Sequence, residues 1–298
     1  MDLLRAIGPP VLALVTVLVI DVQTRRRGLL PPRFQIPEGA DSRAVLTVLG
    51  RRVLAATVLW LILWVGVFMP LGSLGIEQEI DFSLLSGIDL FALHLMLVFC
   101  VAIWYLTGFV PLEADADRGR MGWRAQLGLR TDSVWREIGI GLLAGVAAWL
   151  AVIGTLLGVA LIIWWLGGED LLPQKPPAMI PWIAGLPVVL RIGISLSAGF
   201  VEEVFFRGYL QPRVGLALST ALFILAHASY EQPLMLVGVG LLSVIYGLLV
   251  RWRQNIWPAI AAHALFDAVQ LLLVIPAALR VLPENGAGVN VTAVLGLL

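Results

Sequence analysis

The sequence predicts an all-α, polytopic membrane protein, a bundle of about eight transmembrane helices. The first reason is composition: 59% of the 298 residues are hydrophobic, 13% are charged and the mean hydropathy is +0.93. Soluble domains carry roughly a quarter charged residues, so a water-soluble fold of this length could not hide so much apolar surface. The other two reasons are a series of apolar stretches long enough to cross a bilayer and the placement of arginine between them.

The first apolar stretch, residues 6–22, resembles a secretory signal peptide only superficially. One arginine precedes it, three arginines follow it, and no small-residue cleavage pattern comes after it. A signal peptide carries its positive charge before the apolar run. We therefore expect a retained first span whose charged end stays inside the cell.

A transmembrane helix needs about 20 mostly apolar residues, and eight stretches meet or approach that length. They are 6–22, 52–70, 88–110, 138–166, 180–200, 214–229, 234–250 and 256–280. We expect the fifth to continue as helix through the EEVFFR segment that follows it. The sixth and seventh are short, so we expect them to tilt or to lie within the bundle, and the apolar tail 287–298 is too short to span.

Arginine gives the predicted spans a direction. Four alternate connections hold 16 of the 20 basic residues, while the opposite connections are acidic or nearly uncharged. Because cytoplasmic loops of membrane proteins are enriched in arginine and lysine, this pattern predicts eight spans with both termini outside. The arginine-rich segments are 21–52, 111–137, 201–213 and 251–255, and the opposite ones include 72–82 and 167–177.

The chain divides into three parts on this reading. Residues 1–137 supply N-terminal spans and cytoplasmic loops, 138–280 form the polar-bearing membrane core, and 281–298 form a short tail. The single cysteine, Cys100, has no partner for a disulfide or a cysteine-based metal site. We expect the lipid bilayer to surround the protein, and we expect no nucleic-acid partner.

Three segments of the second half place ionisable residues inside apolar helices. In EEVFFR, Glu203 and Arg207 are four positions apart and can pair on one helix face, whereas Glu202 points about 100° away. FILAH ends at His227, and HALFD places His263 and Asp267 one turn apart. Each group alone could be structural. Together they fall within 66 residues, and ionisable groups in spans cost about 2.5–3.5 kcal/mol each and are functional by default.

Such a set of side chains contains the parts of a water-activating hydrolytic site. A carboxylate in apolar surroundings can act as a general base near neutral pH, with histidine orienting the water or donating a proton. Alternatively, glutamate and two histidines could hold a zinc ion with an open fourth position. The chain contains no HExxH and no GxSxG motif. A proton relay in a transporter also fits carboxylates and histidines within a bundle.

The three segments, in this order, resemble the CPBP family of membrane proteins, which contains type II CAAX prenyl endopeptidases and bacterial abortive-infection proteins. The family pattern EExxxR, FxxxH and HxxxN or HxxxD reads here as EEVFFR, FILAH and HALFD. The resemblance covers about 180–280, and the GLR…WRE stretch at 128–137 looks similar too. The resemblance implies an intramembrane endopeptidase with eight helices, which would be a multi-pass protein of a prokaryotic cell membrane.

The resemblance also implies roles for individual residues. Glu202 would activate the water with His227, while His263 and Asp267 would stabilise the oxyanion or complete a metal site. The bracing set would be Glu203, Arg207 and the motif residue Phe223. The family has been described both as metalloproteases and as metal-independent glutamate proteases. Where some members carry asparagine, this chain has Asp267, which is a better metal ligand. This difference favours a divalent metal, with zinc as the first candidate. Its ligands would be Glu202 and His227, with His263 and Asp267 as further candidates.

Arg191 in the fifth predicted span carries a further hypothesis. It lies eleven residues before Glu202, which returns it to nearly the same helix face about 16 Å away. It could bind the C-terminal carboxylate of a substrate, or it could be an arginine that extends towards the outer membrane surface.

The sequence thus predicts an endopeptidase acting on a peptide or a membrane-associated protein, with the site opening to the cytoplasmic side. Nothing in the sequence indicates prenylated substrates. Two other classes stay open at this stage: a non-catalytic membrane scaffold or immunity protein of the same fold, and an ion-coupled transporter.

Overall fold

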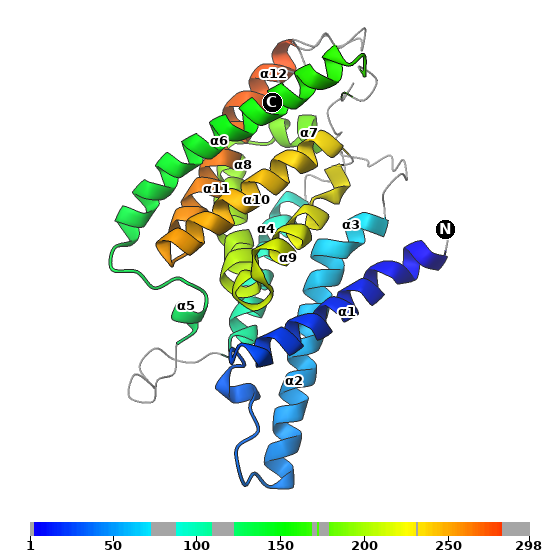
Figure 1. Cartoon of the computed structure of the whole chain (residues 1–298), viewed down its shortest axis with the longest axis vertical. Helices are drawn as coiled ribbons and strands as arrows, with labels where there is room; N and C mark the ends of the chain where they lie inside the picture. Colours follow the sequence, from blue (N-terminus) through cyan, green and yellow to red (C-terminus); the bar gives the residue numbers. More distant parts are fainter. Residues whose placement is uncertain are drawn as a thin grey trace.

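The computed structural model describes residues 3–72, 88–108, 122–168, 172, 179–230 and 232–281, and over these residues the regular structure is helical (Figure 1). The acidic connection 72–82 beyond Gly72, most of the connection 167–177 and the apolar tail 287–298 lie outside the described residues.

The first part of the chain supplies three long helices. The second of these starts ten residues before the predicted 52–70 span. Asp41 is its N-cap, because the Asp41 side chain accepts a 2.7 Å hydrogen bond from the backbone of Ala44. The elements are α1 (Leu3–Arg26), the short 3-10 turn η1 (Pro32–Phe34), α2 (Ser42–Leu63), the π-helical turn η2 (Trp64–Phe68), α3 (Met69–Gly72) and α4 (Ile88–Leu106).

The second part is a longer series of helices. Ser133 begins the longest one by accepting a hydrogen bond from the backbone of Arg136, as the Thr-Asp-Ser sequence there suggests. The elements are α5 (Trp123–Gln126), α6 (Val134–Trp165), α7 (Met179–Gly185), α8 (Val188–Glu203), the π-helical segment η6 (Val204–Leu210), α9 (Gln211–Ala226), the 3-10 turn η7 (Ala228–Tyr230), α10 (Pro233–Arg253), α11 (Trp257–Val269), the π-helical turn η8 (Gln270–Val274) and α12 (Ile275–Val281).

Five helical stretches of the described chain are long and apolar enough to cross a membrane. They correspond to the predicted first, second, fourth, seventh and eighth spans: Arg5–Arg26, Ser42–Leu71, Val134–Trp165, Pro233–Arg253 and Trp257–Leu279. Their side chains are mostly not buried inside the protein, as expected for helices that face lipid. The chain is a multi-pass, all-α membrane protein, and the three shorter predicted spans pack among these five.

The predicted fifth span, 180–200, is not one helix. Pro187 separates α7 from α8, because proline lacks a backbone N–H and pushes the residue before it out of helical geometry. The expectation that helix continues through EEVFFR is confirmed, with one difference: after Glu203 the turns widen into the π-helix η6. The chain then breaks at Gly215, whose φ of 85° suits glycine, and turns back as the rest of α9.

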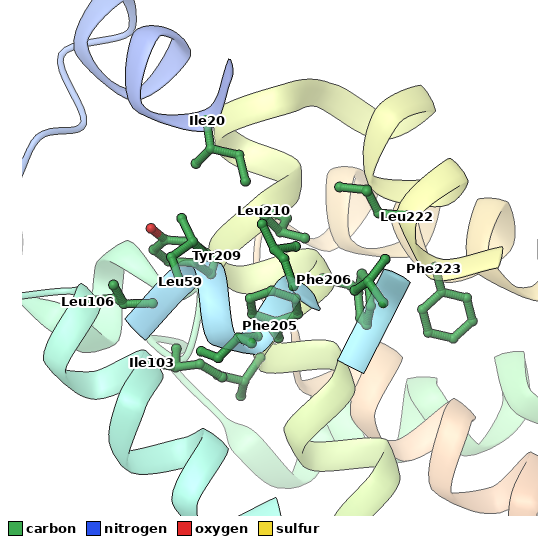
Figure 2. Packing of buried hydrophobic residues seen from close by; sticks show 14 of the residues in the cluster. Ile20, Leu59, Ile103, Leu106, Phe205, Phe206, Tyr209, Leu210, Leu222 and Phe223 are labelled. Carbon is green, nitrogen blue, oxygen red and sulfur yellow. The ribbon is translucent and has the colours of Figure 1, made fainter. Parts of the chain in front are cut away.

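The main apolar core surrounds η6. Phe205, Phe206 and Tyr209 of this segment are buried and lie among side chains of α1, α2, α4 and α9, as Figure 2 shows. The surrounding residues labelled there include Ile20, Leu59, Ile103, Leu106 and Leu222. The segment that carries the EExxxR motif is therefore held from both halves of the chain.

Helix α11 packs very closely against two neighbours. On α6, a Cβ added at Gly145 would lie 3.0 Å from Ala262 Cα. On α8, a Cβ added at Gly199 would lie 2.8 Å from the backbone nitrogen of Ala264. Small residues allow helices in membranes to approach at backbone distance, so these glycines bring α11 against α6 on one side and α8 on the other.

The four arginine-rich segments meet at one end of the bundle. Arg27, at the end of α1, donates a 2.9 Å hydrogen bond to the carbonyl of Pro212. Arg253, at the end of α10, donates two hydrogen bonds, of 2.9 and 2.7 Å, to the buried carboxylate of Glu137 near the start of α6. Both contacts join segments that the arginine pattern places on one side of the membrane.

The close contact at Gly199 predicts opposite effects for two alanine substitutions on the same helix. Gly199→Ala should destabilise the protein by about 1–3 kcal/mol, because the new methyl group overpacks against α11. Gly193→Ala, where a Cβ meets nothing within 4 Å, should be neutral or stabilising by up to about 1 kcal/mol, because alanine is the better helix former. Thermal unfolding of the two purified variants in detergent compares them, and equal midpoints would contradict the packing described for α8 and α11.

Candidate functional site

The two neighbouring glutamates of the EEVFFR segment have different surroundings. Glu203 is fully buried, whereas the side chain of Glu202 is 26% exposed. This is the divergence expected for successive helix positions. Each carboxylate then joins a different histidine.

Glu203 lies at the centre of a buried polar cluster. Its Oε1 atom is 3.1 Å from Nη1 of Arg207 and accepts a 2.9 Å hydrogen bond from Nδ1 of His263. The predicted pairing of Glu203 with Arg207 is confirmed. The bond from His263 joins α11 to α8, and its partner Glu203 was not predicted, because helical spacing identifies only the intrahelical neighbour Asp267.

Arg207 is held from several sides. Its guanidinium carbon lies 4.3 Å from the centroid of the Phe223 ring, and Nη2 is 3.4 Å from the carbonyl oxygen of Ser243 on α10. A cation over an aromatic face is favoured, most of all away from water. Phe223, the first residue of the FILAH motif, thus braces the arginine of the first motif.

Glu202 faces His227, the residue that ends α9. Oε2 of Glu202 is 3.9 Å from Nε2 of His227, and both side chains are partly accessible, at 26% and 16%. Nδ1 of His227 donates a 2.8 Å hydrogen bond to the carbonyl of Phe223. Because a carbonyl can only accept, this bond places the proton on Nδ1 and leaves Nε2 of the neutral ring as an acceptor directed at Glu202.

His263 and Asp267 share one face of α11, as predicted. Oδ2 of Asp267 is 3.6 Å from Nε2 of His263, and the Asp267 side chain is 26% exposed. His263 therefore lies between two carboxylates, with Glu203 at Nδ1 and Asp267 at Nε2. The ring of Tyr246 on α10 stacks on this imidazole, with 5.4 Å between centroids and 25° between planes.

The predicted residues are brought together around the Phe223 ring. Its centroid is 4.6 Å from that of His227 and 6.2 Å from that of His263. Glu202 and Asp267 reach the group through these two histidines. Side chains from α8, α9 and α11 thus form one polar group, with a more exposed part at Glu202 and His227 and a buried part at Glu203.

The described residues contain no group of three or more histidine, cysteine, aspartate or glutamate side chains placed to hold a metal ion. Glu202 and His227 supply two donors. His263 has its Nδ1 engaged by Glu203 and its Nε2 beside Asp267. A structural zinc site takes four protein ligands and a catalytic one takes three. The donor arrangement therefore does not fit the predicted zinc site, and zinc stays a prediction from the sequence alone.

Arg191 has a partner within the protein. Its Nη1 donates a 2.9 Å hydrogen bond to the carbonyl of Leu271 in the π-helical turn η8. The widened turn offers that carbonyl to a side chain. This contact favours a structural role, and substrate binding by Arg191 stays a prediction.

Sequence reasoning missed three residues that shape the site: Gly199, Ser243 and Tyr246. Gly199 lies three residues before Glu202, so its small size was a signal that could have been used. Ser243 and Tyr246 lie in an uninterrupted apolar span with no motif. Only the packing of α10 against η6 and α11 reveals them.

Comparison with known proteins finds a family match over the part of the chain that holds this site. Residues 184–269 match the family model described as type II CAAX prenyl endopeptidase Rce1-like. A stretch of 79 residues, 26% of this chain, is 34% identical to the uncharacterized protein YpbD of Bacillus subtilis (strain 168) and covers 42% of that protein. No solved structure matches. The matched family segment contains α8, η6, α9, α10 and α11, the elements that hold the site.

The buried cluster predicts that removing the charge of Arg207 is costly unless Glu203 is neutralised too. Arg207→Met should destabilise the protein by about 3–5 kcal/mol, because it leaves a carboxylate buried without its cation. Glu203→Gln added to this variant should restore part of the loss, since the amide carbonyl still accepts from His263. Unfolding midpoints of the single and double variants test the point, and a double variant less stable than Arg207→Met would contradict it.

Proposed function

We propose that this chain, whose residues 184–269 match the family model of Rce1-like type II CAAX prenyl endopeptidases, is an intramembrane endopeptidase in which Glu202 and His227 activate the attacking water. The observation that carries the proposal is the pair itself: Oε2 of Glu202 and Nε2 of His227 lie 3.9 Å apart, on two partly accessible side chains, and Oε2 is buried with no hydrogen-bond partner among the described residues.

This separation suits a single water molecule. A water lying between the two acceptors can donate one hydrogen bond to Oε2 of Glu202 and the other to Nε2 of His227. In the reaction, the oxygen of the water forms a bond to the carbonyl carbon of the peptide, and Glu202 accepts a proton from that water. The carbon–nitrogen bond then breaks, and the leaving amine takes that proton.

Surrounding residues keep this pair in place. The hydrogen bond from His227 to the Phe223 carbonyl fixes the ring orientation, and the Phe223 ring is in turn covered by Arg207. Glu203 and Arg207 therefore act as positioning residues. The His263 ring lies 6.2 Å from that of Phe223, between centroids, and Asp267 lies beside its Nε2 atom. We assign the His263 ring, oriented by Asp267, the stabilisation of the oxyanion that forms at the carbonyl.

The substrate of this proposal is a peptide or a membrane-associated protein. The family match supports peptidase activity and a protein substrate, while no residue of the site indicates a prenylated substrate. The arginine-rich end of the bundle is assigned to the cytoplasm by the charge pattern. With eight crossings both termini lie outside, in the cell membrane of a prokaryote.

Removing either member of the activating pair should abolish cleavage without unfolding the protein. Glu202→Gln and His227→Ala should each lower turnover by about 10²–10⁴-fold, the usual contribution of general acid–base groups. The measurement is the appearance of new peptide termini, by mass spectrometry, when proteoliposomes holding the full chain are incubated with a mixture of membrane-protein peptides.

Asp21→Asn is the matched control, since it neutralises an exposed carboxylate on α1 that pairs only with the nearby Arg25 in the described contacts. It should cleave like the unaltered chain. Undiminished cleavage by Glu202→Gln, or no product from the unaltered chain, would rule out the proposed role.

The donor arrangement also predicts that cleavage does not require zinc. Incubation with 1,10-phenanthroline should leave turnover within about twofold of the untreated rate, because two nearby donors make a weak site for that ion. Metal content of the purified protein measured in parallel gives a second readout. Loss of activity on chelation, with recovery on adding zinc, would instead support the metal-dependent alternative that Asp267 suggested.

A further inference from the structure

A cavity of about 730 Å³ lies at the arginine-rich end of the bundle, away from Glu202 and His227. It is formed where the chain leaves α1, where η6 passes into α9, and where α10 gives way to α11. All four arginine-rich segments of the sequence contribute to its lining, through Arg27, Gln126, Arg213 and Arg251 among others.

Among the described lining residues, the charged side chains are all arginines. Arg27, Arg207, Arg213 and Arg251 all border the cavity, and the described lining residues include no aspartate or glutamate. Of these four, Arg207 pairs with Glu203, whereas no ion pair joins Arg27, Arg213 or Arg251 to a carboxylate of the described residues. A concave surface with one sign of charge concentrates ions of the other sign.

Arg213 makes the strongest case for a ligand. It is 2% exposed, stacks on the Tyr209 ring at 4.0 Å and donates through Nη1 to the Tyr209 carbonyl at 2.7 Å. Its Nε atom is buried and makes no hydrogen bond in the structure. A buried cation with an unused donor is costly, and an anion in the cavity would offset that cost.

The size and surroundings of the cavity indicate the class of anion. Small-molecule sites commonly measure about 300–1,000 Å³, and guanidinium groups match the geometry of phosphate oxygens. Apolar side chains of Leu29, Leu30 and Val250 lie beside the arginines in the same lining. Basic pockets between transmembrane helices on the cytoplasmic side commonly take phospholipid headgroups.

We propose that this cavity is a binding site for a phosphate-bearing anion, supplied either by an anionic phospholipid headgroup or by a soluble phosphate compound. The site is separate from peptide hydrolysis and does not depend on the proposed function. The two share one side chain, because Arg207 borders the cavity and also pairs with Glu203.

Binding to the full chain in neutral detergent tests the proposal, with dihexanoyl phosphatidylglycerol and inorganic phosphate as the anionic probes and dihexanoyl phosphatidylcholine as the zwitterionic reference. Apparent affinity is read from the rise of the unfolding temperature on titration and from adducts in native mass spectrometry. We expect an anionic probe to bind at least about tenfold more tightly than phosphatidylcholine, because charge-assisted hydrogen bonds are the strong ones.

Two double variants with the same change of charge separate a built site from general electrostatic attraction. Arg27→Gln with Arg251→Gln alters the cavity lining at two positions that are exposed and so tolerate substitution. Arg26→Gln with Arg43→Gln alters two exposed arginines that do not border the cavity. The first pair should weaken anion binding about tenfold or more, and the second should leave it within about twofold.

Each outcome is decisive. Saturable binding of phosphatidylglycerol but not of inorganic phosphate assigns the site to a lipid headgroup, and binding of inorganic phosphate alone assigns it to a soluble compound. No anion-dependent stabilisation, or equal weakening by both double variants, overturns the proposal. Because no cleavage is measured, such a failure would not bear on the peptidase function.

Discussion

Burial of the Glu203 carboxylate is the constraint on which the rest of this structure depends. A charged group inside a membrane protein is retained only when other side chains take over the role of water. Here Arg207 supplies the opposite charge from the next helical turn, and His263 supplies a hydrogen bond from α11. The second contact requires α11 to approach α8 at backbone distance, which glycine at position 199 permits.

The same constraint explains why two neighbouring glutamates can have separate tasks. Glu203 is committed to the cluster that joins the helices, so Glu202, about 100° around the helix axis, is left to face His227. The widened turns of η6 begin directly after this pair, and π-helical turns are often found at functional sites. Phe223 then connects the two tasks, because it contacts Arg207 on the structural side and both histidines on the reactive side.

Charge at the other end of the bundle also serves more than one purpose. The arginines that orient the chain in the membrane are not spread evenly over that end. Arg253 closes α10 onto α6 through Glu137, whereas Arg213 is buried beside Tyr209 without a carboxylate partner among the described residues. Orientation needs only the number of positive charges. Their concentration around one cavity is a feature of the fold, and it suggests a ligand.

The sequence by itself determined the class of fold and the identity of the polar residues. Hydropathy located the long spans, arginine placement predicted which connections share a side, and the spacing of Glu203 with Arg207 and of His263 with Asp267 predicted both intrahelical contacts. These are local properties, set by helical periodicity and by the exclusion of water from lipid. The break at Pro187 could have been read from proline chemistry.

Only the tertiary structure decided that His263 meets Glu203. Periodicity gives the face on which a side chain lies but not the helix opposite that face, so the bond between Glu203 and His263 depends on how closely α8 and α11 pack. The same holds for Tyr246, which carries no sequence signal and is placed by the packing of α10 against α11. The cavity likewise needs four segments, distant along the chain, to meet at one end.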